Sequence, residues 1–221
     1  ANFGYILSGN LSGTITSNIY RITGDINVSA SDLVTIEHGT QFLFDGPYRF
    51  DIYGILIVQG TETDSIIFNN LEPMTTEPWR GFNMYNQSEE TIFDYVRISG
   101  GYKNSYEGDG GGINMTSSNP ILRHVKISDN VTENSGGGLN LSYSNPVMNH
   151  VIIENKIALE NGGGLHLFYS NPTLINVTIS DNASIDESWD GSQSPLWSGG
   201  LYLYNSEPII VNTIIWDNFP E

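Results

Sequence analysis

Aromatic and histidine side chains recur beside a repeated glycine-leucine segment in the second half of the sequence. In the copies at 164–168 and 200–204, leucines alternate with His166, Phe168, Tyr202 and Tyr204. Period-two alternation places successive side chains on opposite sides of a β-strand, so these four face outward when the leucines face the core. Aromatic rings offer apolar area with a polar edge, which suits the faces and hydroxyl groups of sugars. We therefore identify the four residues as a candidate sugar-binding surface.

Three further aromatic residues extend this candidate surface. Tyr85 occupies the same outward position in an earlier, degenerate copy, and Trp189 and Trp197 lie in an insertion between the last two copies. The structural alternative is that these rings pack under the insertion or brace each other as a ladder across neighbouring strands. The sequence leaves both interpretations open.

Acidic residues gather on the loops of the same edge. Asp109, Asp186, Glu187 and Asp190 are candidate ligands of Ca²⁺, which takes six to eight oxygen atoms. The alternative is that they are solvated loop carboxylates, since the spacing is not that of an EF-hand. Asp109, Glu133 and Asp186 are also candidates for the carboxylate pair of a glycoside hydrolase, but no spacing selects two of them.

Histidine and asparagine share one position near the middle of each copy. This column contains His124, His150, Asn176 and Asn212. Two imidazoles stacked on neighbouring copies could bind a transition metal. Because asparagines replace them in the following copies, the column is interpreted as a structural ladder that satisfies turn backbone groups.

All these positions are set by an internal repeat. Gly112, Gly138 and Gly164 recur at steps of 26 residues, and Gly200 opens a fourth copy 36 residues after Gly164, so about ten residues are inserted before it. Such a period indicates a solenoid. Apolar residues align in columns throughout, which predicts three short strands per copy, joined by tight turns and stacked around one continuous apolar core. Two of these columns are Ile113, Leu139, Leu165 and Leu201, and Val125, Val151, Val177 and Thr213.

The segment from Gly162 to Ile179 reads Gly-Gly-Gly-Leu-His-Leu-Phe-Tyr-Ser-Asn-Pro-Thr-Leu-Ile-Asn-Val-Thr-Ile. This pattern resembles the right-handed parallel β-helix proteins of the pectate-lyase-like superfold. The resemblance implies an all-β right-handed parallel β-helix, or solenoid, with about 26 residues per rung and roughly seven to eight rungs.

The same resemblance implies a saccharide groove on the first-strand sheet and an asparagine ladder at the turn, which Asn176 and Asn212 match and the two histidines interrupt. A lyase of this family takes its base from Arg or Lys. The outward columns contain neither, and Arg80 and Lys103 are only nearby. We therefore expect no catalytic residues on this face.

The chain is expected to form one domain over residues 1–221. Within it we expect an N-terminal capping region at 1–30, irregular rungs at 31–109, and regular repeats at 110–218 with an insertion at 183–198. The last rung has no evident cap. Its apolar Ile214 and Trp216 are therefore candidates for self-association.

Composition narrows the classes of partner. Eight Lys and Arg against 25 Asp and Glu give 221 residues a net charge of −17, which disfavours nucleic acids and anionic membranes. There is no cysteine, hence no disulfide or thiolate metal site. No apolar run reaches 18 residues, so no membrane insertion is expected. Richness in Gly, Asn, Ser, Thr and Tyr, together with the resemblance, favours a secreted or cell-surface location.

The sequence thus favours a secreted, non-catalytic, rigid module for adhesion or for binding a neutral polysaccharide. Two alternatives remain open. One is a structural subunit that stacks end to end in an extracellular assembly. The other is a polysaccharide lyase or glycoside hydrolase.

Overall fold

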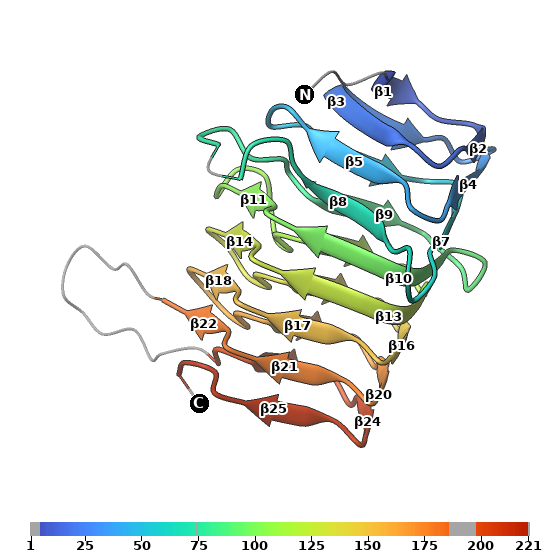
Figure 1. Ribbon diagram of the computed structural model, residues 1–221. Coiled ribbons are helices and arrows are strands. Elements are labelled where there is room, and N and C mark those ends of the chain that lie inside the picture. Colours follow the sequence, from blue (N-terminus) through green and yellow to red (C-terminus); the bar gives the residue numbers. More distant parts are fainter. Residues whose placement is uncertain (1–4, 74, 186–197, 221) are drawn as a thin grey trace.

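The computed structural model describes residues 5–73, 75–185 and 198–220, and the regular elements in these ranges are all β-strands (Figure 1). Among the described residues, 21 strands form one sheet that winds around a central axis, and four short strands form a second sheet. Successive turns of the winding pair in parallel. The predicted all-β parallel helix is confirmed.

The large sheet passes over three faces of the rod. Face 1 consists of β6 (Phe50–Ile52), β9 (Phe82–Tyr85), β12 (Ile113–Thr116), β15 (Leu139–Ser142), β19 (Leu165–Phe168) and β23 (Leu201–Tyr204). Face 2 consists of β2 (Gly13–Ile15), β4 (Leu33–Glu37), β7 (Ile55–Gln59), β16 (Val147–Asn149), β20 (Thr173–Ile175) and β24 (Ile209–Val211). Face 3 consists of β5 (Gln41–Phe44), β8 (Ile66–Asn70), β17 (Ile152–Glu154), β21 (Thr178–Ser180) and β25 (Ile214–Trp216).

Four longer strands bend at a corner and join two faces. They are β1 (Tyr5–Asn10) and β3 (Ile19–Val28), which run from face 3 to face 1, and β10 (Ile92–Ser99) and β13 (Ile121–Ser128), which run from face 2 to face 3. The strands β1 and β3 already follow the parallel path. The region expected to cap the rod also contributes strands to the same sheet.

The core lies inside the winding. Leu139 pairs with Leu165, and Leu165 with Leu201, as the repeat predicts. The inward side chains of the regular rungs before the last are fully buried, and each apolar one contributes roughly 1.5–3 kcal/mol by leaving water. Nearer the N-terminus the core is aromatic. Phe42 stacks on Phe68 with ring centroids 4.9 Å apart, and Phe44 stacks on Trp79 at 4.5 Å.

The second sheet is a departure from the three strands expected per copy. It consists of β11 (Tyr102–Lys103), β14 (Val131–Thr132), β18 (Ile157–Ala158) and β22 (Ala183–Ser184), and it follows one side of the rod (Figure 1). A two-residue strand is too short to show alternation, so the sequence pattern missed it. Because Ala183 and Ser184 belong to β22, the insertion expected from 183 begins after this strand. No helix in the described ranges is long and apolar enough to span a membrane.

Candidate functional site

The turn between face 1 and face 2 presents side chains in an unusual backbone conformation. In the regular rungs, the residue that precedes Ser-Asn-Pro has a positive φ: 50° at Ser117, 52° at Tyr143 and 48° at Tyr169. Asparagine visits this left-handed region more readily than a bulky residue does. Tyr143 and Tyr169 are therefore held there by their surroundings.

Two ladders of side-chain hydrogen bonds hold this turn. The Ser118 amide donates to Ser144 Oγ, and the Ser144 amide donates to Ser170 Oγ, each at 2.9 Å. The Asn145 amide donates to Asn119 Oδ1 at 2.7 Å, a contact that Asn171 repeats with Asn145 at 2.6 Å. Each of these turn amides, buried at Ser118 and Ser144 and exposed at Asn145 and Asn171, has an acceptor on a neighbouring rung, so the turn geometry is copied from rung to rung.

The turn tyrosines join two outward aromatic residues of face 1 in one group, here called the aromatic cluster: Tyr143, Phe168, Tyr169 and Tyr204. Tyr143 stacks on Tyr169 at 5.4 Å, and Phe168 stacks on Tyr204 at 5.1 Å. Phe168 meets both turn tyrosines edge to face, at 5.7 and 4.7 Å. The exposed fractions are 56% for Tyr143, 42% for Tyr169 and 44% for Tyr204, so the cluster remains open to solvent.

Half of this cluster could be predicted from the sequence. Phe168 and Tyr204 follow from strand alternation, whereas Tyr143 and Tyr169 lie beyond the strand and were missed. The available signal was an aromatic residue directly before Ser-Asn-Pro in two successive copies. A second aromatic pair lies further along face 1, where Tyr85 stacks on Tyr53 at 4.8 Å.

The other outward column of face 1 is buried at Asn83, Asn140 and His166 and half-buried at Asn114 and Tyr202. The His166 side chain is 9% exposed, and its Nδ1 lies 2.6 Å from Asn140 Oδ1. Asn140 in turn donates to Asn114 Oδ1 at 2.8 Å. Burial lowers the pKa of His166, and the charge of Asp109 opposes this shift. Tyr202 is half-buried and stacks on His166 at 5.3 Å. These two residues face away from the core, but His166 is not part of an open surface.

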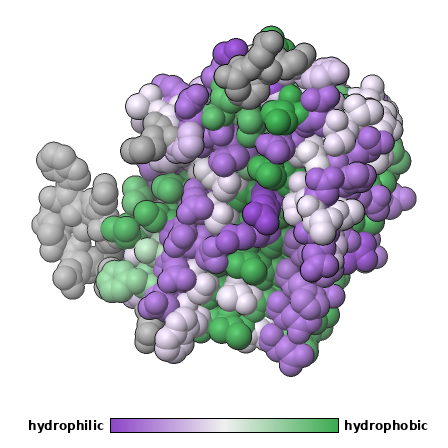
Figure 2. Space-filling view, viewed as in Figure 1, coloured by the Kyte–Doolittle hydropathy of each residue, from purple (hydrophilic) through white to green (hydrophobic). Residues whose placement is uncertain are grey.

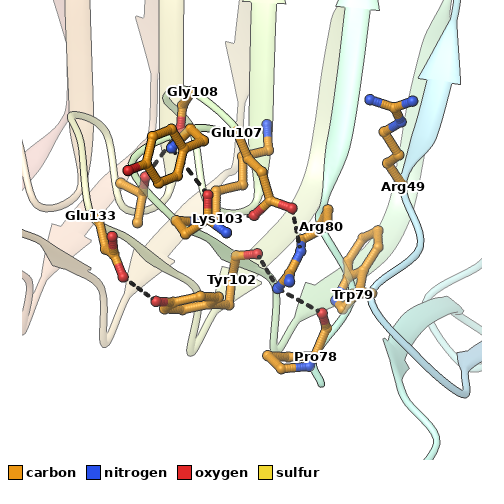
Figure 3. A network of polar contacts seen from close by, with 12 residues as sticks. Arg49, Pro78, Trp79, Arg80, Tyr102, Lys103, Glu107, Gly108 and Glu133 are labelled. Atoms are coloured by element: carbon orange, nitrogen blue, oxygen red, sulfur yellow. Dashed lines mark hydrogen bonds and ion pairs between the residues drawn. The ribbon is translucent and has the colours of Figure 1, made fainter. Parts of the chain in front are cut away.

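A polar network ties the loop after β11 to the rod (Figure 3). Arg80 Nε donates to Glu107 Oε1 at 2.7 Å, and Arg80 Nη1 donates to the carbonyl oxygens of Pro78 and Tyr102. The Tyr102 hydroxyl donates to Glu133, which also accepts the Ser105 amide at 3.0 Å. Both bonds lower the pKa of the Glu133 carboxyl, the tyrosine bond more strongly.

The loop carboxylates are thus occupied by contacts that order the loops. Asp109 Oδ1 accepts the Ser135 amide at 3.0 Å, and Glu133 has the two partners named above. In the ranges that the structure describes, no three His, Asp or Glu side chains are arranged to hold a metal ion. Asp186, Glu187 and Asp190 lie outside those ranges, as do Trp189 and Trp197.

Lys103 lies at the centre of the network and is buried to 1% exposure (Figure 3). Its Nζ donates to Asn83 Oδ1 at 2.7 Å and to the Asp109 carbonyl at 3.0 Å. Burial lowers its pKa from 10.5 to about 7, against the opposing charges of Asp109, Asp51 and Glu107. The buried amine fastens the loop to face 1.

A second lysine is buried at a position that asparagine occupies in the other regular copies. Asn182 Nδ2 donates to the Ile153 carbonyl at 3.0 Å, whereas Lys156 Nζ donates to the Glu154 carbonyl at 2.8 Å. Burial lowers the pKa of Lys156 well below its ordinary value. Strand alternation gave no sign of either buried lysine, because Lys103 ends a two-residue strand and Lys156 directly precedes one, and such strands are too short to show a pattern.

The predicted ladder residues lie at the corner between faces 2 and 3. His124, His150, Asn176 and Asn212 all have positive φ, from 48° to 55°. His124 stacks on Tyr95 at 4.2 Å and on His150 at 5.2 Å, and its Nδ1 lies 2.9 Å from Asp94 Oδ1. Figure 2 shows hydrophilic residues along the edge of the rod that carries β16, β20 and β24, where this corner lies.

The last described rung exposes side chains that are buried elsewhere. Ile215 is 46% exposed, whereas Ile179, its partner on the preceding rung, is fully buried. The predicted self-association residues Ile214 and Trp216 are 60% and 71% exposed. A depression of about 490 Å³ lies here, lined by residues that include Leu203, Ile215 and Trp216.

Comparison with known proteins agrees with this architecture. The family model described as "right handed beta helix region" matches residues 53–219, which is most of the chain. The protein therefore belongs to the right-handed β-helix family. No curated protein and no solved structure matches the chain.

Proposed function

We propose that this β-helix is a non-catalytic module that binds a neutral polysaccharide through the aromatic cluster, at a cell surface or in the extracellular medium. One observation carries the proposal: Tyr143 and Tyr169 are displayed at left-handed turn positions. A non-glycine residue there costs on the order of 1 kcal/mol or more. Asn86 and Asn205 occupy the same position in other rungs with a better-suited residue. The strained and exposed tyrosines thus indicate a role outside stability.

The charge distribution favours a neutral ligand. The chain carries a net charge of −17, and the aromatic cluster itself contains no charged residue. Polyuronates and other polyanions would meet repulsion unless a cation intervened. Neutral sugars face no such penalty, and exposed tyrosines provide both apolar area and hydroxyl groups.

The hydrogen bonding favours binding over catalysis. Asp109 and Glu133, the described candidates for a hydrolytic pair, accept backbone amides or a tyrosine hydroxyl. Lys103, one of the two basic residues near this face, is buried beneath the loop and donates to two acceptors. Each of these groups is engaged in hydrogen bonds that stabilise a loop. It would have to give up these bonds to act as an acid, base or nucleophile on a substrate.

The test is retention on a panel of neutral and acidic polysaccharides, with and without Ca²⁺, scoring binding and new chain ends together. We expect retention by at least one neutral polysaccharide. The double variant Tyr143→Asn/Tyr169→Asn should weaken it at least tenfold, because truncating aromatic anchors of an interface costs on the order of 1 kcal/mol or more each. Asparagine suits the turn conformation, so the fold is preserved.

Tyr106→Asn provides the matched control, because Tyr106 is 97% exposed and lies outside the cluster. This control should bind as the unmodified protein does. New chain ends would refute the non-catalytic assignment. Equal retention of the double variant and the control would show that the aromatic cluster is not the binding surface.

The apolar surface of the last described rung favours a second candidate function, end-to-end stacking of copies. Ile214, Ile215 and Trp216 present strand edges and apolar side chains together, a combination that promotes pairing with another chain. Light scattering tests this candidate. A molar mass that increases with concentration, and that Trp216→Lys returns to one chain, would support stacking. A single-chain mass at high concentration would refute it.

A further inference from the structure

Between the two aromatic pairs of face 1 lies a stretch of small side chains. In the strand register, Tyr85 pairs with Thr116, Thr116 with Ser142, and Ser142 with Phe168. Tyr85 and Phe168 are therefore three strand spacings apart, or about 14 Å. Tyr53 backs the first ring and Tyr204 backs the second.

Three hydroxyl groups line this stretch, on Thr116, Ser117 and Ser142, here called the hydroxyl strip. Ser117 is exposed and the other two are half-buried. Among the described residues, no protein group bonds to any of the three hydroxyls. Ser118 and Ser144, their sequence neighbours, are fully buried, and both of their hydroxyls bond within the turn ladder. Ser118 and Ser144 therefore stabilise the turn, whereas the hydroxyl groups of Thr116, Ser117 and Ser142 are available to a ligand.

The strip itself is uncharged, and Tyr85 at its end is affected by the opposite charges of Asp51 and Arg49. Glu89 and Glu90 are exposed on the turn that follows Tyr85. These carboxylates, together with the net charge of −17 of the whole chain, disfavour uronic acids and other anionic ligands. Hydroxyl groups that act as donor and acceptor suit neutral sugar hydroxyls, and the rings at both ends suit apolar sugar faces.

We infer that the hydroxyl strip and its two flanking aromatic pairs bind a neutral oligosaccharide of more than one pyranose ring, laid along the rod between Tyr85 and Phe168. This inference rests on the proposed function and adds the length and place of the ligand. A pyranose ring is roughly 5 Å across, from bond lengths like those of the backbone. A single sugar therefore contacts one aromatic pair, and a ligand of about three rings contacts both.

The test is calorimetric titration with linear glucose and mannose oligosaccharides of one to six units. Affinity should increase from one unit to about three units and then level off. Ser142→Phe fills the strip and should weaken binding of the three-unit ligand at least tenfold. Thr173→Phe, which adds the same ring to a half-buried position on face 2, is the matched control and should bind normally.

Tyr85→Ala is a second, independent test of the binding site that does not introduce a bulky residue. It should reduce the affinity for three-unit ligands and leave that for one-unit ligands unchanged, because short ligands can use Phe168 alone. Thermal unfolding of each variant checks the fold.

The outcomes separate this inference from the proposed function. If the turn-tyrosine variant loses binding while Ser142→Phe and Tyr85→Ala bind all lengths normally, the strip is refuted and the aromatic cluster stands. If affinity does not depend on ligand length, the strip is likewise refuted. If no polysaccharide or oligosaccharide binds the unmodified protein, both proposals are wrong.

Discussion

Replacing the buried Lys103 with methionine should remove a specific part of the pH dependence of stability. The Lys103 side chain is almost fully buried and donates to Asn83 and to the Asp109 carbonyl. Burial lowers its pKa to about 7 in the folded protein, from 10.5 for an ordinary lysine. Asp51, Asp109 and Glu107 favour the charged amine and Arg49 opposes it, but desolvation outweighs them.

The sign follows from the protons bound in each state. Between pH 7 and pH 10.5 the unfolded chain keeps a proton on Lys103 that the folded chain has released. The free energy of unfolding therefore increases with pH across this range, by about 1.4 kcal/mol per pH unit where the difference is one whole proton. From pH 7 to pH 9 the expected gain from Lys103 is about 2 kcal/mol, since the folded amine is still half-protonated at pH 7.

Urea unfolding at pH 6, 7, 8 and 9, followed by tryptophan fluorescence, measures this gain. Lys103→Met should lose the Lys103 part of the slope. Any contribution of Lys156, whose pKa burial also lowers, should remain. The variant also leaves two acceptors without a donor, which lowers stability equally at all four pH values. Lys126→Met is the control, because the Lys126 ammonium pairs with Glu154 at the surface.

A Lys103→Met variant with the full slope of the unmodified protein would refute the reasoning. So would an unmodified protein whose stability does not change between pH 7 and pH 9. Either result would mean that the amine is hydrated or charged in the folded state.

Three further predictions concern the turn ladder, the closed histidine and the core. Ser144→Ala should cost about 1–3 kcal/mol in urea unfolding, because the buried amide of Ser118 loses its acceptor; an unchanged midpoint would contradict the ladder. Because burial lowers the pKa of His166 in the folded protein, the imidazole is protonated at a higher pH in the unfolded chain than in the folded one. The free energy of unfolding should therefore decrease as the pH is lowered from 6.5 to the pKa of His166 in the folded protein. His166→Asn, which copies Asn140, should flatten that loss, and an identical acid profile would argue against burial of the imidazole. Val151→Asp places an unpaired charge in the core and should prevent folding, as circular dichroism would show; a folded variant would contradict the inward orientation of Val151.

The regular half of the fold could be predicted because each rung repeats the same local pattern. Alternation and the glycine spacing place Leu139, Leu165 and Leu201 in one column, and the observed strand register pairs these residues. The degenerate copy at Phe82 and Met84 also pairs in register with the next rung. Periodicity is a property of the chain itself, so it needs no knowledge of distant contacts.

The candidate site could be predicted only in part, because alternation distinguishes the core side of a strand from its outer side and says nothing about solvent. His166 and Phe168 alternate with the same leucines, yet the first is closed off and the second joins the exposed aromatic cluster.

The sequence by itself determined the solenoid, its rung length and the identity of the inward columns, since these depend on neighbours a few residues apart and on a constant period. Tertiary structure decided the display of Tyr143 and Tyr169, because their left-handed turns depend on hydrogen bonds between rungs 26 residues apart. It also decided the burial of Lys103, because the loop after β11 that contacts this amine is fixed by Arg80 and Glu133, which lie 23 and 30 residues away in the sequence. Burial and strain are properties of the stacked rungs together, and no single rung contains them.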